Sequence, residues 1–235
     1  MQTLYKSYDM NVHKAYIIRI KDNEKSETLA KRCADSCDNV NMEYEYWDAY
    51  NGISNPISEP KQVNSLMKLF KLSDHYMVRG EVACFLSHLS LWVKCLEIEK
   101  PIVILEHDAV MIKKYKTHKL FNSICYLGND EQKNRGWDVM LTPPFGSAGN
   151  NYFFVCRAHA YAIDPTIARN MVSYIMKYGI SSSLDTILRS DIFNIHQIGL
   201  YAYDVKESFD DRNGTTILNR PEEGRPGIRN DKLLK

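Results

Sequence analysis

Two acidic residues separated by a single position, Glu106 and Asp108, follow an apolar run near the middle of the chain. Residues 102–105 are continuously apolar, which is typical of a buried parallel strand. In open α/β sheets, ligands bind beyond the carboxyl ends of the strands. Two carboxylates at such an end can hold a hard divalent cation through oxygen, and the cation would neutralise a diphosphate. The spacing alone is common, and the alternative interpretation is a solvated turn after a core strand.

Two further predicted strands end at charged residues. Residues 15–20 form a short β-branched and aromatic run whose end carries Arg19, and residues 41–46 alternate toward Asp48. Because parallel strands bring their carboxyl ends to one edge of a sheet, these side chains are expected at the same edge as the acidic pair.

The elements that would position these residues alternate between strand and helix. Such alternation predicts an α/β sheet that is mostly parallel in its first half. Residues 138–141, 152–163 and 198–205 have further strand character, and residues 209–235 are expected to be irregular. Helices are expected over residues 23–36, 80–99 and 165–178, with another helix beginning after the serines at 181–183.

The strongest predicted helix spans residues 80–99 and is apolar around most of its circumference. We expect neighbours to cover it on more than one side. Glu81 and His88 lie beside its apolar stripe, where a buried hydrogen-bonded pair or a contact at the helix start is favoured over a direct chemical role. Cys84 and Cys95 are interpreted as core residues. The stripe consists of Val82, Phe85, Leu86, Leu89, Trp92, Val93 and Leu96.

Composition narrows the class of protein. The chain has 235 residues and a net charge of +1, which argues against a nucleic-acid-binding protein. Apolar residues make up 44% and charged residues 25%, as in ordinary globular domains. Apolar runs fall short of the roughly 18 residues of a membrane helix, and residues 1–10 lack a signal region. We expect a soluble protein that is located in the bacterial cytoplasm or, if the protein is viral, in the cytoplasm of the host cell. The six cysteines lack C-x-x-C spacing, so free thiols are favoured over disulfides or metal ligation.

Two segments of the sequence resemble glycosyltransferase family 25, which includes lipopolysaccharide-type sugar transferases and collagen galactosyltransferases. Residues 80–92 read Gly-Glu-Val-Ala-Cys-Phe-Leu-Ser-His-Leu-Ser-Leu-Trp, and residues 104–109 read Ile-Leu-Glu-His-Asp-Ala. The family typically has Gly-Glu-x-Gly-Cys-x-x-Ser-His and then Leu-Glu-Asp-Asp-Ala. Residues 48–52, 160–163 and 183–188 are similar to further family segments in the same order.

Three departures from the family pattern stand out. Ala83 replaces a usual glycine, and the first strand lacks the usual Ile-Asn-Leu. His107 stands where the family has the middle aspartate, although Glu106 and Asp108 are kept. Imidazole is itself an acceptable manganese ligand, so this change weakens metal binding less than an apolar residue would.

The resemblance implies a GT-A fold, in which a Rossmann-like, mostly parallel sheet is flanked by helices. It implies a single glycosyltransferase domain over residues 1–220, with a donor half at about 10–112, an acceptor half at about 113–220 and a polar tail at 221–235. The implied activity is transfer of galactose or glucose from UDP-galactose or UDP-glucose to an acceptor hydroxyl, with inversion and with Mn²⁺ or Mg²⁺. The acceptor would be a lipopolysaccharide core or other glycan, a lipid-linked glycan or hydroxylysine in a collagen-like protein.

The resemblance also implies roles for individual residues. Asp108 would be the main metal ligand, with Glu106 or His107 in support. Asp185 would be the general base that takes the acceptor proton, or else a carboxylate favoured by a helix N-terminus. Contacts to the donor would come from Arg19, Asp48, Ala49, Glu81, Glu106 and His107.

Two other functions remain open at this point. The first is a non-catalytic nucleotide-sugar-binding or interaction module of the same fold, for which His107 would mark lost activity. The second is a metal-dependent phosphohydrolase that uses the same acidic strand end. The retained outer acids and the largely intact helix motif favour an active transferase.

Overall fold

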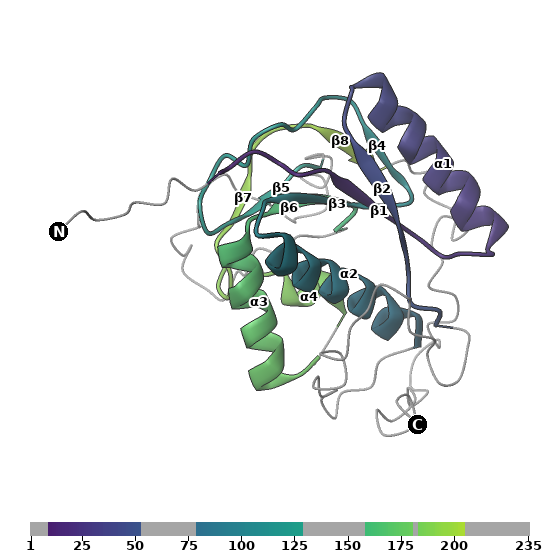
Figure 1. Ribbon diagram of the computed structural model, residues 1–235. Coiled ribbons are helices and arrows are strands. Elements are labelled where there is room, and N and C mark those ends of the chain that lie inside the picture. Colours follow the sequence, from purple (N-terminus) through teal and green to yellow (C-terminus); the bar gives the residue numbers. More distant parts are fainter. Residues whose placement is uncertain (1–8, 53–78, 129–157, 181–182, 205–235) are drawn as a thin grey trace, which may run out of the picture.

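A six-stranded sheet forms the centre of the protein in the computed structural model, which describes residues 9–52, 79–128, 158–180 and 183–204 (Figure 1). Two short strands, β4 (Ala109–Met111) and β8 (Ala202–Asp204), pair with each other in a separate two-stranded antiparallel sheet. In spatial order the six strands are β2 (Tyr44–Asp48), β1 (Ala15–Arg19), β3 (Ile102–Glu106), β6 (Ala160–Ile163), β5 (Ile124–Tyr126) and β7 (Ile195–Gln197).

The central sheet is mostly parallel, as predicted. Strand β1 pairs in parallel with both β2 and β3, and β5 pairs in parallel with β7. Strand β6 runs antiparallel to both of its neighbours, β3 and β5. The carboxyl end of β6 therefore lies at the opposite edge of the sheet from the carboxyl ends of β1, β2 and β3.

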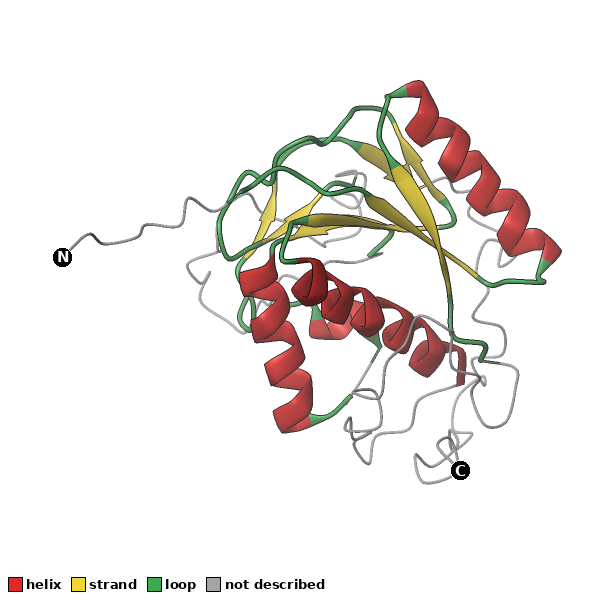
Figure 2. Cartoon of the chain, viewed as in Figure 1, coloured by secondary structure: helices red, strands yellow, loops and turns green. Residues whose placement is uncertain are grey.

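Helices cover both faces of the sheet, which makes a three-layer α/β fold (Figure 2). Helix α1 (Glu24–Asn39) lies on one face, and helices α2 (Arg79–Ile98), α3 (Pro165–Tyr178) and α4 (Leu184–Ile187) lie on the other. Side chains that alternate along the strands divide the core accordingly: Ile17 and Val103 face α1, whereas Ile18 and Ile104 face α2. This arrangement is the Rossmann-like sheet expected of a GT-A fold.

Local capping explains where the helices begin and end. The Asn23 side chain accepts a hydrogen bond from the Ser26 N–H at the start of α1. The Asp164 side chain does the same for Thr166 and Ile167 at the start of α3, where Pro165 occupies the first turn. These helices, and α2, lie where the sequence predicts them.

The structure differs from the prediction in its short strands. Strands β4 and β5, each of three residues, were not predicted from the sequence. The strand predicted at 198–205 is wrong in extent, because β7 ends before Gly199 and β8 begins after it. Gly199 has φ +116°, which a strand does not accommodate. The strand predicted at 138–141, residues 152–157 and the tail at 209–235 lie outside the described residues.

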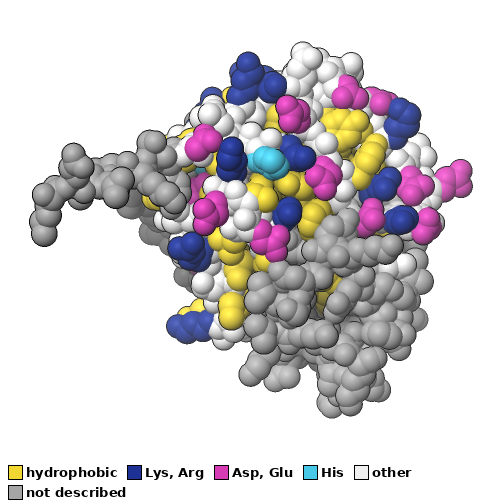
Figure 3. Space-filling model, in the orientation of Figure 1, with side chains coloured by type: hydrophobic (Ala, Val, Ile, Leu, Met, Phe, Trp, Pro, Cys, Tyr) yellow, Lys and Arg dark blue, Asp and Glu magenta, His cyan; other side chains and the backbone are white. Residues whose placement is uncertain are grey.

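Several remaining expectations concern the chain as a whole. In the described ranges, no helix is long and apolar enough to cross a membrane. The five cysteines in these ranges are free thiols, and Cys156 lies outside them. Basic and acidic side chains are interspersed on the face seen in Figure 3. The boundaries of the domain and of its donor and acceptor halves stay predictions.

Candidate functional site

The register of the sheet brings three charged strand ends to one edge. Arg19 at the end of β1 is the direct partner of Asp48 at the end of β2. On the other side of β1, Ile18 is the partner of Glu106 at the end of β3. The strand ends that the sequence analysis singled out are therefore neighbours, at the edge where open α/β sheets bind ligands.

Arg19 and Asp48 form one group at this edge, beside Tyr46 of the α1-side core, whereas the Ala49 side chain packs against the α2-side core and joins the group through its backbone. The Arg19 Nε donates to Asp48 Oδ1 at 3.3 Å, and the Ala49 N–H donates to the Arg19 carbonyl at 2.7 Å. The guanidinium also stacks on the Tyr46 ring, 4.4 Å from its centroid. About a quarter of each charged side chain remains exposed, 27% for Arg19 and 28% for Asp48. The pair is held in place yet accessible to a ligand.

Glu106 lies on the α2 face, against two side chains of that helix. His88 Nε2 lies 3.1 Å from Glu106 Oε1, and the Cys84 thiol donates to the same oxygen at 3.9 Å. Burial lowers the pKa of His88 to about 3, against the attraction of Asp185, so the ring is neutral. The ligand atoms of Cys84, His88 and Glu106 lie within 4.8 Å of one another.

The carboxylates of Asp185 and Asp108 both affect the pKa of the Cys84 thiol. Burial raises the pKa of the Cys84 thiol, and the charges of Glu106, Asp185 and Asp108 raise it further, in that order. Asp108 also contributes to the raised pKa of Cys33 on α1, after a hydrogen bond to Cys37 and burial. The charge of Asp185, in the first turn of α4, thus reaches the same thiol as that of Asp108, although 77 residues separate the two in the sequence.

His107 points to the other side of the sheet from Glu106. Its Nδ1 lies 3.2 Å from the Ser26 hydroxyl of α1, and Ser26 Oγ accepts the Ile20 N–H at 2.8 Å. Burial lowers the pKa of His107 to about 4, and Lys25 and Arg32 contribute to this decrease. The neutral ring therefore joins the β3–β4 turn to the start of α1. Its expected role in donor binding stays a prediction.

The structure corrects the interpretation of the 80–99 helix. The carboxylate beside His88 is that of Glu106, not that of Glu81, which lies partly buried in the first turn of α2. The expected contact between Glu81 and the donor stays a prediction. Cys84 is only partly buried and lies at the site, whereas Cys95 is a core residue, as predicted. The spacing of Cys84, His88 and Trp92, four residues apart on one helix face, was the signal that could have revealed this group.

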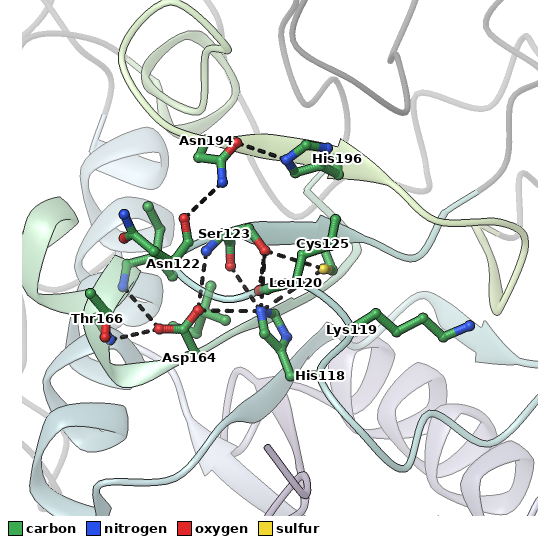
Figure 4. Close-up of polar contacts among 12 residues, drawn as sticks. His118, Lys119, Leu120, Asn122, Ser123, Cys125, Asp164, Thr166, Asn194 and His196 are labelled. Carbon is green, nitrogen blue, oxygen red and sulfur yellow. Dashed lines mark hydrogen bonds and ion pairs between the residues drawn. The ribbon is translucent and has the colours of Figure 1, made fainter. Parts of the chain in front are cut away.

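A second buried polar cluster lies at the opposite edge of the sheet (Figure 4). His118 Nε2 lies 3.4 Å from Asp164 Oδ2 and donates to the Ser123 carbonyl at 3.0 Å. Both charged side chains are fully buried. Asp164 caps α3 and accepts the Ser123 N–H at 3.1 Å. This cluster joins β5, β6 and α3, and we assign it to stability rather than to the candidate site.

Comparison with known proteins identifies the family. The family model described as glycosyltransferase family 25 (LPS biosynthesis protein) matches residues 12–139, more than half of the chain. The chain belongs to glycosyltransferase family 25. It is also similar to the lipooligosaccharide biosynthesis protein lic2B of Haemophilus influenzae, with 31% identity over 93 residues. That match covers 39% of this chain and 30% of the relative, so it spans less than a third of the relative's length.

The family match covers most of the candidate site. Arg19, Asp48, Glu106 and Asp108 fall within the matched residues, as does the whole of α2. Asp185 falls outside them. The placement of Asp185 beside the site therefore rests on the fold of this family 25 member and on the electrostatic influence of its carboxylate on Cys84 and His88.

Proposed function

We propose that this glycosyltransferase moves galactose or glucose from a UDP-sugar to an acceptor hydroxyl, with inversion at the anomeric carbon. The observation that carries the proposal is the convergence of Arg19, Asp48 and Glu106 at the carboxyl ends of three adjacent parallel strands. Lipopolysaccharide core or another glycan is the leading acceptor, because the similar protein lic2B is a lipooligosaccharide biosynthesis protein. A lipid-linked glycan and hydroxylysine are the other acceptor classes.

The donor would lie across the two groups of the site. Arg19, Asp48 and Ala49 would contact the nucleoside, with Asp48 as an acceptor for its hydroxyl groups. Glu81 in the first turn of α2 would face the sugar. The protein's contribution here is to fix the donor, since two of these side chains are already held by each other.

The residues at the end of β3 fit a hard divalent cation. Glu106 and Asp108 offer carboxylate oxygens, the ligands that Mn²⁺ and Mg²⁺ prefer, and 28% of the Glu106 side chain is exposed. When bound, the cation would neutralise charge on the departing diphosphate. His107 is directed toward Ser26, so Asp108 and Glu106 are the proposed ligands.

Asp185 is the proposed general base. The acceptor oxygen would form a bond to the anomeric carbon while the bond from that carbon to the diphosphate oxygen breaks, and the hydroxyl proton would pass to a carboxylate. Asp185 is supported by its position on α4 beside the α2 face of the site, where its charge reaches His88 and Cys84. The general acid–base contribution expected from such a group is about a hundredfold or more.

A panel of nucleotides tests the donor assignment. Calorimetry with UDP, GDP, CDP and ADP, each with and without Mn²⁺, should give tightest binding for UDP in the presence of the metal. UDP at a hundred times its Kd should stabilise the fold by about 2.7 kcal/mol. Equal or absent binding across all four nucleotides would remove the donor assignment.

A transfer assay separates the enzyme from the non-catalytic alternative. UDP-galactose and UDP-glucose are incubated with lipooligosaccharide acceptors, and released UDP is measured against incorporated sugar. UDP binding without sugar release or transfer would favour a nucleotide-sugar-binding module.

A further inference from the structure

A chain of buried hydrogen bonds runs from the core to the end of β3. The Trp92 Nε1–H donates to the Tyr161 hydroxyl at 3.0 Å. The Tyr161 oxygen lies 2.8 Å from His88 Nδ1, and His88 Nε2 lies 3.1 Å from Glu106 Oε1. Two residues of α2 and one of β6 therefore connect in sequence to the carboxylate of the candidate site.

The donor and acceptor capacities of these groups determine where each proton lies. Indole nitrogen can only donate, so the Tyr161 oxygen accepts from Trp92. Tyr161 must then give its own proton to His88 Nδ1, the other partner of its hydroxyl among the described residues. Because Nδ1 accepts this proton, the ring proton of His88 is on Nε2, where it is donated to the Glu106 carboxylate.

Burial of these side chains fixes the assignment of donors and acceptors along the chain of hydrogen bonds. Trp92 and Tyr161 are fully buried and His88 is 1% exposed, so bulk water cannot replace a missing partner. The His88 and Tyr161 rings also stack, with centroids 5.7 Å apart and planes 11° apart. The register of β3 with β6 pairs Tyr161 with Ile104, two residues before Glu106 on the same face of the sheet. Each member is thus fixed by backbone geometry as well as by its hydrogen bonds.

We propose that Trp92, Tyr161 and His88 are positioning residues. Trp92 and Tyr161 hold His88 in the Nε2–H tautomer, and in that form His88 fixes the Glu106 carboxylate for donor binding. The inference rests on the proposed function, since Glu106 matters in this way only if it contacts the metal or donor. A carboxylate held by a fixed neutral donor keeps its charge and has one preferred orientation, so less conformational entropy is lost when the ligand binds.

The hydrogen bonds of His88 argue against a metal centre formed by Cys84, His88 and Glu106. A metal bound by Cys84, His88 and Glu106 would need the lone pair of His88 Nε2, which moves the ring proton to Nδ1. Tyr161 would then accept from both Trp92 and His88, and its own buried proton would lose the acceptor that it now has. The hydrogen-bond chain therefore favours positioning over a Cys–His–Glu metal centre.

The tautomer can be measured directly on the full chain. Nitrogen-15 NMR of the histidine rings, without nucleotide, should show His88 neutral with its proton on Nε2, and Tyr161→Phe should perturb that signal. A proton on Nδ1 in the wild type would overturn the proposal. This measurement does not depend on whether the chain binds UDP, so it separates failure of the hydrogen-bond chain from failure of the proposed function.

Binding of UDP with Mn²⁺ tests the positioning role. Calorimetry should show at least a tenfold loss of affinity for Tyr161→Phe and for His88→Leu, the scale of losing a hydrogen bond to a charged group. His88→Gln, which keeps an amide donor toward Glu106, should restore affinity to within about threefold of wild type. The matched control is Tyr115→Phe, which removes another buried hydroxyl beside a histidine, His118, on the α1 side of the sheet.

A purely structural role gives a different pattern. In that case Tyr161→Phe and His88→Leu would lower the midpoint of thermal unfolding but leave the Kd of the folded protein at the wild-type value. Unchanged Kd in both folded variants would overturn the proposal. If Tyr161→Phe or His88→Leu does not fold, the tautomer of His88 in the wild type and the UDP affinity of His88→Gln still test the proposal.

Discussion

The buried His118–Asp164 pair gives the protein a pH-dependent stability whose size can be worked out from its surroundings. Burial opposes the charged ring, but hydrogen bonds to Asp164 and Cys125, and the attraction of both groups, raise the pKa of His118 to about 9 from 6.5. One pKa unit corresponds to about 1.4 kcal/mol. Protonated His118 therefore contributes about 3 kcal/mol to the free energy of unfolding.

The sign of the effect follows from the raised pKa. Folding favours the proton on His118, so the contribution is complete below about pH 6.5 and is lost as the pH rises through about 9. The pKa of Asp164 is lowered, despite burial, by the hydrogen bond to His118, so its contribution is lost at the acid end instead. The pair stabilises the fold most between these limits.

Urea unfolding monitored by tryptophan fluorescence measures the effect. The free energy of unfolding is compared at pH 6 and pH 9.5 for a Cys125→Ala background and for the same background with His118→Gln. Removing Cys125 is necessary because His118 lowers the pKa of that thiol, which would titrate in the same range. We expect the background to lose more than the His118→Gln variant, by less than about 3 kcal/mol because Cys125 no longer supports the charged ring and Asp164 alone does. An equal loss in both would refute the assignment of a charged buried pair.

Two further predictions concern the candidate site. Asp185→Asn should leave UDP affinity unchanged but lower the rate of sugar transfer about a hundredfold or more, because it removes the proposed base; a near wild-type rate would place the base elsewhere. His107→Asp should change UDP affinity in Mn²⁺ by less than about threefold in calorimetry, since the His107 ring contacts Ser26; a tenfold gain would show that position 107 supplies a ligand oxygen.

The helices and strands that were predicted well are those whose ends are determined by residues close to them in the sequence. Helix α3 spans Pro165–Tyr178, the predicted range, because Asp164 caps its start and Gly179, with φ 77°, ends it. The buried strand β3 was visible as an apolar run, and its charged end as the candidate site. In each case the determining interactions lie within a few positions along the chain.

The features that sequence reasoning missed depend on pairing between distant segments. Strands β4 and β5 are three residues long, and their partners, β8, β6 and β7, lie far along the chain. The carboxylate partner of His88 is 18 positions away, and Tyr161 is 73 positions away. Periodicity shows which helix face is buried, but it does not identify the strand residues that the face will contact.

We propose that the acidic end of β3 holds a metal that binds the diphosphate of a nucleotide donor. The most direct test is calorimetry of UDP binding to wild type and to Asp108→Ala, each with Mn²⁺ and with chelator, with Asp35→Ala of the exposed α1 surface as the control. We predict that Mn²⁺ strengthens UDP binding to wild type and to the control, and that Asp108→Ala abolishes this increase. The same Mn²⁺-dependent increase in Asp108→Ala would contradict the claim.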